Sequence, residues 1–402
     1  MKRRITIQLS LMMFLEFFVW GSWFVTMGTY MGRALGSGGG EIGTAYMTQA
    51  WGAILAPFIV GLIADRYFQA QKLLGLIHLA GAYLLYRIGV AEDFVAFYPL
   101  LLAYMVLYMP TLALANSVAF HQMHDPSAQF ARVRVWGTVG WIAAGMLIGY
   151  VLQWEGRELL QYTFILGAGS SLVLGLFSFT LPETPPGAKG EKVTLARIVG
   201  LDALRLLKAR NYLVFLLSSV LICIPLAFYY SFANPFLNEV GMANAAGNMA
   251  IGQISEVLFM LLLPVFLNRF GLKWTLIAGM LAWGLRYTLF AMGDAGSGAW
   301  MLFGGIILHG ICYDFFFVSG QIYTDVKAGE KIRSSAQGLI TLATYGVGML
   351  IGYRVSGVIV DHYLEEGGHL WDTIWLYPAG FAYLVLLLFI LFFRNEKVNY
   401  HP

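Results

Sequence analysis

The segment YLVFLLSSVLICIPLAFYYSFANPFL, residues 212–237, decides the fold class, because it is apolar throughout and contains no Asp, Glu, Lys or Arg. A helix needs about 20 predominantly apolar residues to cross the hydrocarbon core of a bilayer, and this segment is long enough. The whole chain of 402 residues has the same character, with 59% hydrophobic and 12% charged residues. Soluble domains carry about twice that charged fraction, so the sequence predicts a membrane protein.

Eleven further apolar segments of spanning length flank this one. They lie at about 5–31, 42–64, 71–90, 95–120, 132–153 and 161–182 before it, and at about 244–268, 272–293, 299–325, 334–360 and 372–393 after it. We therefore expect an all-α integral membrane protein with twelve transmembrane helices in two six-helix bundles, residues 1–182 and 212–402. The first segment is too long for a signal peptide and lacks a small-residue cleavage site, so we expect it to be retained.

A hydrophilic linker, residues 183–211, separates the two predicted bundles. It begins with the turn-rich sequence Glu183-Thr184-Pro185-Pro186-Gly187, which cannot continue a helix. From residue 193 to 208, apolar residues recur at helical spacing among basic ones. This pattern predicts a short interfacial helix on the inner leaflet of the membrane.

The distribution of basic residues predicts the orientation in the membrane. If both termini are cytoplasmic, 20 of the 25 Lys and Arg residues fall in cytoplasmic segments, two fall outside and three fall within spans. Cytoplasmic loops of membrane proteins carry an excess of Lys and Arg. The bias supports an even number of helices and a multi-pass protein of the cell membrane, the inner membrane if the cell is Gram-negative.

Composition and motifs also exclude several function classes. The net charge of +3 is small and concentrated in the loops, so it does not support nucleic-acid binding. Both cysteines, Cys223 and Cys312, lie in apolar runs and suggest neither a disulfide framework nor a metal site. We find no phosphate-binding glycine loop and no nucleophile with a base at suitable spacing. We therefore expect no enzyme activity and no cofactor, and find no support for ATP-driven transport.

The loop after the second predicted helix reads Gly61-Leu62-Ile63-Ala64-Asp65-Arg66. It resembles the signature loop between helices 2 and 3 of the major facilitator superfamily, and the arrangement of six helices, basic linker and six helices is typical of two-bundle transporters. Gly61 would permit close helix contact, while Asp65 and Arg66 would form a charge network that closes the cytoplasmic face. The resemblance therefore assigns these three residues to a cytoplasmic gate.

Ionisable residues within the spans are the strongest signal of function, because a charge at bilayer depth costs at least ~2.5 kcal/mol and usually faces a cavity or a partner. The candidates are Glu16, Arg134, Glu256, Arg286, Asp314 and Arg354. Helical spacing places three polar sets each on one helix face: Arg134, Thr138 and Trp141; Gln253 and Glu256; and His309 and Tyr313.

Several blocks together resemble the nucleoside:proton symporter family of the major facilitator superfamily. They are Trp20-Gly21-Ser22-Trp23, Tyr108-Met109-Pro110-Thr111-Leu112, Arg134-Val135-Trp136-Gly137-Thr138-Val139-Gly140, Gln253-Ile254-Ser255-Glu256, Asp314-Phe315-Phe316 and Ser335-Ala336-Gln337-Gly338. The resemblance covers nearly the whole chain. It implies import of a nucleoside with protons by alternating access, with membrane lipid as surroundings, and we expect a functional monomer.

The resemblance also implies the site residues. The substrate-contacting arginine, threonine, glutamine and glutamate of the family fall on Arg134, Thr138, Gln253 and Glu256, and its aspartate in helix 10 falls on Asp314. The chain departs from the family at Trp141, His309 and Tyr313, and also at Ala227 and Tyr230, where an amide pair is expected in helix 7. Trp141, Tyr230 and Tyr313 are suited to stack on or line a base, because aromatic rings offer a large apolar face.

Several alternatives remain open from the sequence. Asp314 and Glu256 are the leading proton-coupling groups, but Asp314 could instead pair permanently with Arg134 or Arg286. Glu16 is either a second protonatable or ligand-binding group in the cavity, or a group that remains protonated and bonded to a neighbouring helix. His309 either assists proton transfer or donates one hydrogen bond to substrate; the other histidines are expected mostly at membrane edges and in tails.

Two other functions remain open from the sequence. One, favoured by the altered residues Ala227 and Tyr230, is proton-coupled transport of another hydroxylated solute, such as a sugar or glycoside. The other is a transporter-like sensor that binds a ligand without moving it. Gly137 and Gly140 are expected to allow close helix packing and not to contact ligand.

Overall fold

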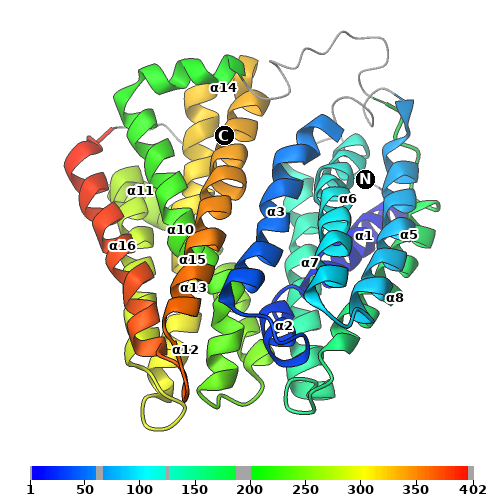
Figure 1. Ribbon diagram of the computed structural model, residues 1–402. Coiled ribbons are helices and arrows are strands. Elements are labelled where there is room, and N and C mark those ends of the chain that lie inside the picture. The colour runs from blue at the N-terminus through cyan, green and yellow to red at the C-terminus, as the bar shows by residue number, and fades with distance from the viewer. Residues whose placement is uncertain (1, 60–66, 124–125, 187–200, 397–402) are drawn as a thin grey trace. The chain divides into compact units, whose positions relative to one another are not determined.

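A computed structural model describes residues 2–59, 67–123, 126–186 and 201–396. The chain forms two compact helical units (Figure 1). Unit 1 comprises Met1–Ser37, Thr48–Val193 and Ala243–Ala250, and unit 2 comprises Gly38–Met47, Thr194–Met242 and Ile251–Pro402. The predicted gate residues Gly61, Asp65 and Arg66 lie outside the described residues.

The helices of unit 1 are mostly long and apolar. A segment that crosses a bilayer must satisfy its own backbone hydrogen bonds, and a helix does so. They are α1 (Arg3–Gly21), α2 (Met27–Ala34), α3 (Gly39–Ile59), α5 (Ala70–Gly89), α6 (Phe94–His121), α7 (Pro126–Met146), the π-helix η2 (Leu147–Leu152) and α8 (Gln161–Ser178). The beginning of α3 is grouped with unit 2. Leu9, Met12, Leu74, Leu114 and Leu174 belong to a buried apolar core of unit 1.

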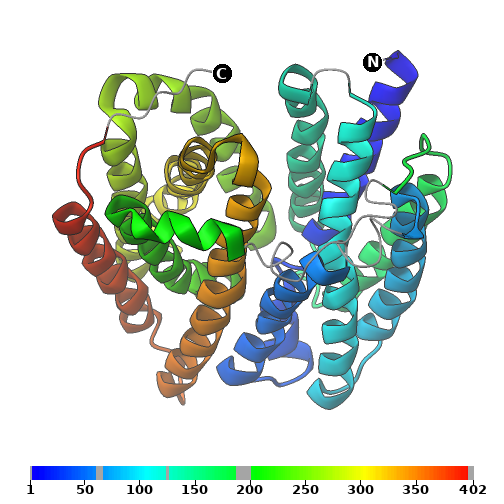
Figure 2. The same ribbon diagram turned by 90° about the horizontal axis from the view of Figure 1, so that it is seen from above.

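Unit 2 contains the helices that carry most of the predicted site. They are the 3₁₀-helix η3 (Leu201–Lys208), α10 (Arg210–Glu239), α11 (Ala245–Met292), α12 (Ala299–Ile307), α13 (His309–Cys312), the π-helix η4 (Tyr313–Val318), α14 (Ser319–Thr341), the π-helix η5 (Leu342–Gly348), α15 (Met349–His362) and α16 (Trp371–Phe392). The beginning of α11 is grouped with unit 1. Figure 2 shows the helices of each unit from above.

Nine helices among the described residues are long and apolar enough to cross a membrane, so a multi-pass membrane protein is confirmed, while the number twelve stays a prediction. The two spans expected at 244–268 and 272–293 form the continuous helix α11, broken at Gly271, whose φ of +77° favours glycine. The segment expected as one helix at 5–31 is divided into α1 and α2 by a turn.

Two details differ from the expectations. The chain is mostly helical, as expected, but β1 (Leu364–Glu365) and β2 (Gly368–His369) pair as a short antiparallel hairpin, in which Gly368 has a φ of +115°. In the predicted interfacial helix at 193–208, the described part, Leu201–Lys208, is a 3₁₀-helix. Such tight turns are used in short pieces between longer elements, and here η3 leads directly into α10.

Candidate functional site

The predicted site residues fall into two sets, one in each unit. Unit 1 carries Glu16, Arg134, Thr138 and Trp141, and unit 2 carries Tyr230, Gln253, Glu256, His309, Tyr313 and Asp314. Each set is described within its own unit.

In unit 1, the face of α7 that carries Arg134, Thr138 and Trp141 is half-buried. The guanidinium of Arg134 lies over the ring of Phe17, 4.1 Å from its centroid, a geometry that attracts a cation to the ring face. The ring of Trp141 meets Trp20 edge-on, with centroids 5.4 Å apart. The structure therefore confirms that α7 presents a polar and aromatic face with all three residues on it.

Glycines bring α7 close to α1. A Cβ added to Gly140 would collide with the carbonyl oxygen of Phe14, and one added to Gly137 would lie 2.7 Å from the ring of Phe17. The expectation that Gly137 and Gly140 serve helix packing is confirmed.

Glu16 is fully buried in unit 1 and bonded to two neighbouring helices. Its Oε2 lies 2.9 Å from Nε2 of His78 on α5, and its Oε1 accepts a hydrogen bond of 2.5 Å from Thr111 on α6. Nδ1 of His78 lies 3.0 Å from Oγ of Ser171 on α8. Glu16 is therefore bonded to neighbouring helices in this structure. We name Glu16, His78, Thr111 and Ser171 the Glu16 cluster.

The expectation that the remaining histidines lie mostly at membrane edges does not hold for His78. This side chain is 1% exposed and lies near the middle of α5. Sequence reasoning missed it, although an imidazole in the middle of an apolar span was a signal of the same kind as Glu16 itself.

In unit 2, four predicted residues come together around a buried arginine. Nη1 of Arg286 lies 3.0 Å from Nδ1 of His309, and Nε2 of His309 lies 3.7 Å from Oε2 of Glu256. The ring of Tyr313 lies 6.0 Å from that of His309, and the ring of Tyr230 lies 6.0 Å from that of Tyr229. We name Arg286, His309, Glu256 and Tyr313, with Tyr229 and Tyr230 of α10, the His309 cluster.

Ser255 holds the helices of the His309 cluster together. Its hydroxyl lies 2.7 Å from two acceptors, the carbonyl oxygens of Gly252 in its own helix and of Ile307 on α12, and its oxygen accepts from the backbone N–H of Gly310, 3.1 Å away. A Cβ on Gly310 would lie 2.6 Å from the carbonyl of Ser255. Ser255 therefore positions its neighbour Glu256 against His309, a role that the sequence did not reveal.

Asp314 is fully buried in η4, and neither carboxylate oxygen has a hydrogen-bond partner among the described residues. The permanent pair with Arg286 that the sequence left open is not formed, since Arg286 instead contacts His309. The next residue back, Tyr313, donates or accepts a hydrogen bond of 2.7 Å with Tyr345 of η5. Tyr345 is a further member of this region that sequence reasoning missed.

The two altered positions of the seventh predicted span, Ala227 and Tyr230 on α10, have different surroundings. Ala227 is fully buried, and a Cβ added to Gly352 of α15 would lie 2.6 Å from its methyl group. Tyr230 is half-buried in the His309 cluster, while Gln253 is half-buried one turn before Glu256. Ala227 is therefore a packing residue in this structure, and Tyr230 is the one that can face a ligand.

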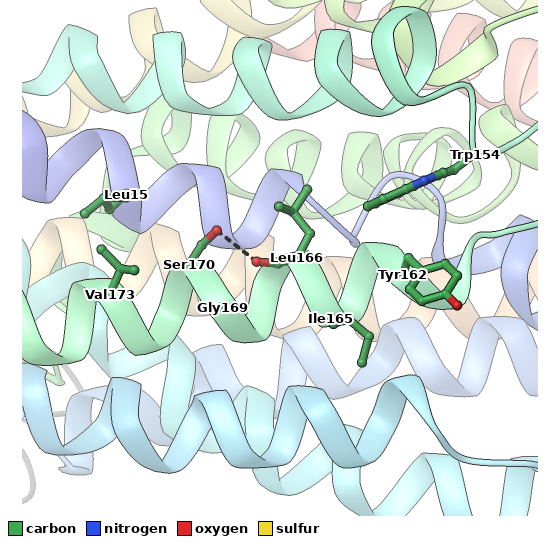
Figure 3. A pocket seen from close by; sticks show the side chains of 8 residues that line it. All are labelled: Leu15, Trp154, Tyr162, Ile165, Leu166, Gly169, Ser170 and Val173. Carbon is green, nitrogen blue, oxygen red and sulfur yellow. Dashed lines mark hydrogen bonds between the residues drawn. The ribbon is translucent and has the colours of Figure 1, made fainter.

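A separate cavity of about 540 Å³ lies along α1 and α8 of unit 1 (Figure 3). Leu15 and Val173 line one end and Trp154 and Tyr162 the other; the hydroxyl of Ser170 between them donates to the carbonyl of Leu166, 2.8 Å away. No predicted site residue lines this mainly apolar cavity. Over the described ranges, no group of three or more His, Cys, Asp or Glu residues is arranged to hold a metal ion.

Comparison with known proteins places this geometry in a family. Residues 3–398 match the family model described as Nucleoside H+ symporter. YegT of Escherichia coli (strain K12) is 46% identical, with 97% of this chain and 94% of YegT aligned. The xanthosine permease of the same organism is 36% identical, over 99% of this chain and 97% of the permease.

The fold agrees with the sequence match. A crystal structure of a mutant of the nucleoside transporter NupG superposes with a TM-score of 0.90 at 32% identity, over 97% of this chain and 100% of that one. The chain belongs to the nucleoside H+ symporter family of the major facilitator superfamily.

Proposed function

We propose that the protein is a proton-coupled symporter that imports nucleosides across the inner (cytoplasmic) membrane by alternating access, and that it acts as a monomer without a cofactor. The observation that carries the proposal is the His309 cluster, in which buried ionisable groups and aromatic rings meet within membrane-length helices. The names of the relatives, xanthosine permease and nucleoside transporter, support the class of substrate.

The chemistry of the side chains suits a nucleoside. Its base needs an aromatic surface, and its ribose needs several hydrogen-bonding groups in a site otherwise closed to water. Tyr230, Tyr313 and Trp141 supply aromatic surface. The hydrogen-bonding groups are those of Gln253, Glu256, His309, Arg134 and Thr138.

Asp314 and Glu256 are the proposed coupling groups. An ionised Asp314 would be a buried charge with neither a cation nor a hydrogen-bond donor among the described residues, which is costly. A proton taken up by Asp314 removes that cost, and exposure to water permits its release. One proton moving down ~100 mV supplies roughly 2.3 kcal/mol, which corresponds to accumulation of about fifty-fold.

Uptake of radiolabelled uridine and adenosine into proteoliposomes, with and without an inward proton gradient, tests the proposal. Wild-type protein is expected to accumulate nucleoside only with the gradient. Asp314→Asn is expected to abolish accumulation but to retain counterflow exchange, because it removes the proton and not the binding groups. Glu256→Gln is expected to lose accumulation and to weaken competition by unlabelled nucleoside.

A second candidate substrate is another hydroxylated solute, such as a sugar or glycoside. The observation that favours it is Ala227, which offers no hydrogen-bonding group where the family has an amide. If neither nucleoside enters or competes while a sugar or glycoside does, nucleoside transport is excluded and this candidate takes its place. Binding without counterflow of any solute would indicate a sensor.

A further inference from the structure

We propose that Arg286 is a positioning residue that holds His309 as the neutral imidazole with its proton on Nε2, so that His309 presents a hydrogen-bond donor beside Glu256 to an acceptor oxygen of the substrate. The transport consequence rests on the proposed function. The protonation state of His309 does not, and it has a readout of its own.

The chemistry of the two groups decides which atom donates. A guanidinium has five N–H donors and no acceptor. Because Nη1 of Arg286 lies 3.0 Å from Nδ1 of His309, Nδ1 must be the acceptor. A neutral imidazole that accepts at one nitrogen carries its proton on the other. The N–H of His309 is therefore Nε2–H, which is the nitrogen that faces Glu256 at 3.7 Å.

Arg286 is held rigidly enough for this task. Its side chain is fully buried, with Cζ 3.4 Å from the centroid of the Tyr229 ring and 5.7 Å from that of Trp283. Tyr229 also stacks on His309, with ring centroids 5.4 Å apart. Tyr229 thus contacts both partners and fixes their mutual orientation, and contact with an aromatic face stabilises the guanidinium.

The same geometry disfavours a positively charged His309. An imidazolium would direct Nδ1–H at a guanidinium N–H, bringing two donors and two positive charges together at 3.0 Å. In the described part of the chain, Arg286 has no carboxylate within ion-pair distance that would offset this repulsion. The titratable groups around His309 are Tyr229 and Tyr230 of α10, Glu256 and Arg286 of α11, and Cys312 and Tyr313 on its own segment.

The assignment separates two roles that the sequence left open for His309. A histidine held neutral by Arg286 donates a hydrogen bond and does not carry the transported proton, which leaves proton uptake to the carboxyl groups. The separation of 3.7 Å from Glu256 is longer than a hydrogen bond. Nε2–H is therefore available to a carbonyl, hydroxyl or ring oxygen of a bound solute.

Nitrogen-15 NMR of protein labelled in the histidine rings tests the protonation state directly. The His309 signals are assigned by their loss in His309→Gln. In wild type they are expected to report a non-protonated Nδ1 and a protonated Nε2 from pH 8 to pH 5.5. This interval is chosen because an unperturbed histidine becomes charged within it, near pH 6.5. In Arg286→Met the ring is expected to become doubly protonated as the pH falls through the same interval.

Arg87→Met is the matched control, because Arg87 also lies over a tyrosine ring, that of Tyr83, but is exposed on α5. It is expected to leave the His309 signals unchanged. A proton on Nδ1 in wild type, or an Arg286→Met protein with unaltered His309 signals, overturns the proposal. If Arg286→Met does not fold, Arg286→Gln replaces it: the neutral amide removes the positive charge beside Nδ1, so the ring is expected to become doubly protonated as the pH falls, and a fully wild-type titration in that variant overturns the proposal as well.

Transport gives a second, independent readout. Arg286→Met is expected to raise the KM for nucleoside about fivefold to tenfold, the equivalent of one lost hydrogen bond, and more strongly at pH 5.5 than at pH 8. His309→Gln keeps an N–H donor, so adding Arg286→Met to it is expected to have little further effect on KM. Additive effects of the two substitutions contradict a role through His309. Absence of nucleoside transport in wild type contradicts the proposed function alone and leaves the NMR result valid.

Discussion

At the scale of single residues, hydrogen-bond donors in the Glu16 cluster can be counted. The hydroxyl of Ser171 donates its proton to the carbonyl of His78, 2.9 Å away, so its oxygen accepts from Nδ1–H. One proton therefore remains between Nε2 of His78 and Oε2 of Glu16, 2.9 Å apart. The hydroxyl of Thr111 lies 2.5 Å from both Oε1 of Glu16 and the carbonyl oxygen of Tyr108. These hydrogen bonds explain how a carboxyl group and an imidazole can both be buried at bilayer depth.

His78→Ala is therefore expected to lower the free energy of unfolding by about 3–5 kcal/mol, because breaking a buried pair leaves its partner uncompensated. His78→Gln, which retains an N–H at the position of Nε2, is expected to lose less. Unfolding in detergent, followed by thermal or chemical denaturation, measures both. Equal stabilities of wild type and His78→Ala would show that Glu16 does not depend on His78.

At the scale of elements, glycines set the distance between helices. Gly140→Ala is expected to destabilise the protein by about 1–3 kcal/mol, because the new methyl group collides with the carbonyl of Phe14 and forces α7 away from α1. Gly169→Ala on α8 is the matched control, since a Cβ there meets no atom within 4 Å. It is expected to be neutral or stabilising, because alanine favours the helix. Thermal unfolding of the two variants tests this prediction. Similar melting temperatures would show that the close contact with Phe14 does not make Gly140→Ala less stable.

A second contact between elements depends on pH. Glu396 follows α16 and accepts hydrogen bonds from Lys327 of α14, from Tyr323 at 3.1 Å and from Asn211 of α10 at 3.1 Å. Burial alone would raise the pKa of the Glu396 carboxyl. These hydrogen bonds and the charge of Lys327 lower the pKa by more than burial raises it, so the pKa lies below the usual 4.5. The contribution of Glu396 to stability is therefore present above pH 4.5 and is lost as the pH falls through the lowered pKa.

Glu396→Gln is accordingly expected to lower the free energy of unfolding by about 1 kcal/mol at pH 7, a modest value because the pair is partly exposed. The difference from wild type is expected to shrink as the pH falls below 4.5. Glu366→Gln, the same change at an exposed residue of the hairpin, is expected to have no effect at either pH. Denaturation curves at a series of pH values test this, and a difference that persists at low pH would exclude the carboxylate as its source.

At the scale of the whole molecule, the sequence predicted what depends on local periodicity and composition. The apolar segments correspond to helices because a chain in lipid must bond its own backbone, and spacing placed Arg134, Thr138 and Trp141 on one face. Contacts between distant helices carry no such signal. Arg286 and His309, 23 residues apart, and His78 and Glu16, 62 residues apart, meet only through packing. The π-helices η4 and η5 likewise have no pattern that spacing reveals.

The number of membrane crossings is the remaining prediction at this scale, and the chain is well suited to a labelling test. Its two cysteines, Cys223 and Cys312, are 1% and 0% exposed, so they should react little with a membrane-impermeant maleimide. Three exposed positions report the sides: Arg4→Cys, Glu158→Cys and Lys208→Cys. With six crossings in the first bundle, Arg4→Cys and Lys208→Cys are expected to react in inverted vesicles and Glu158→Cys in right-side-out vesicles.

The pattern of labelling determines whether the number of crossings is even or odd. Arg4 and Lys208 on one side require an even number between them, and Glu158 on the other side requires an odd number between residues 158 and 208. The basic residues predict this arrangement, because 20 of the 25 lie on the proposed cytoplasmic side. Labelling of Arg4→Cys and Lys208→Cys from opposite sides would mean that one predicted span in the first half does not cross the membrane. The turn-divided segment at 5–31 would then be the first to re-examine, since α1 has 19 residues and α2 has 8, and a helix of 8 residues is too short to cross by itself.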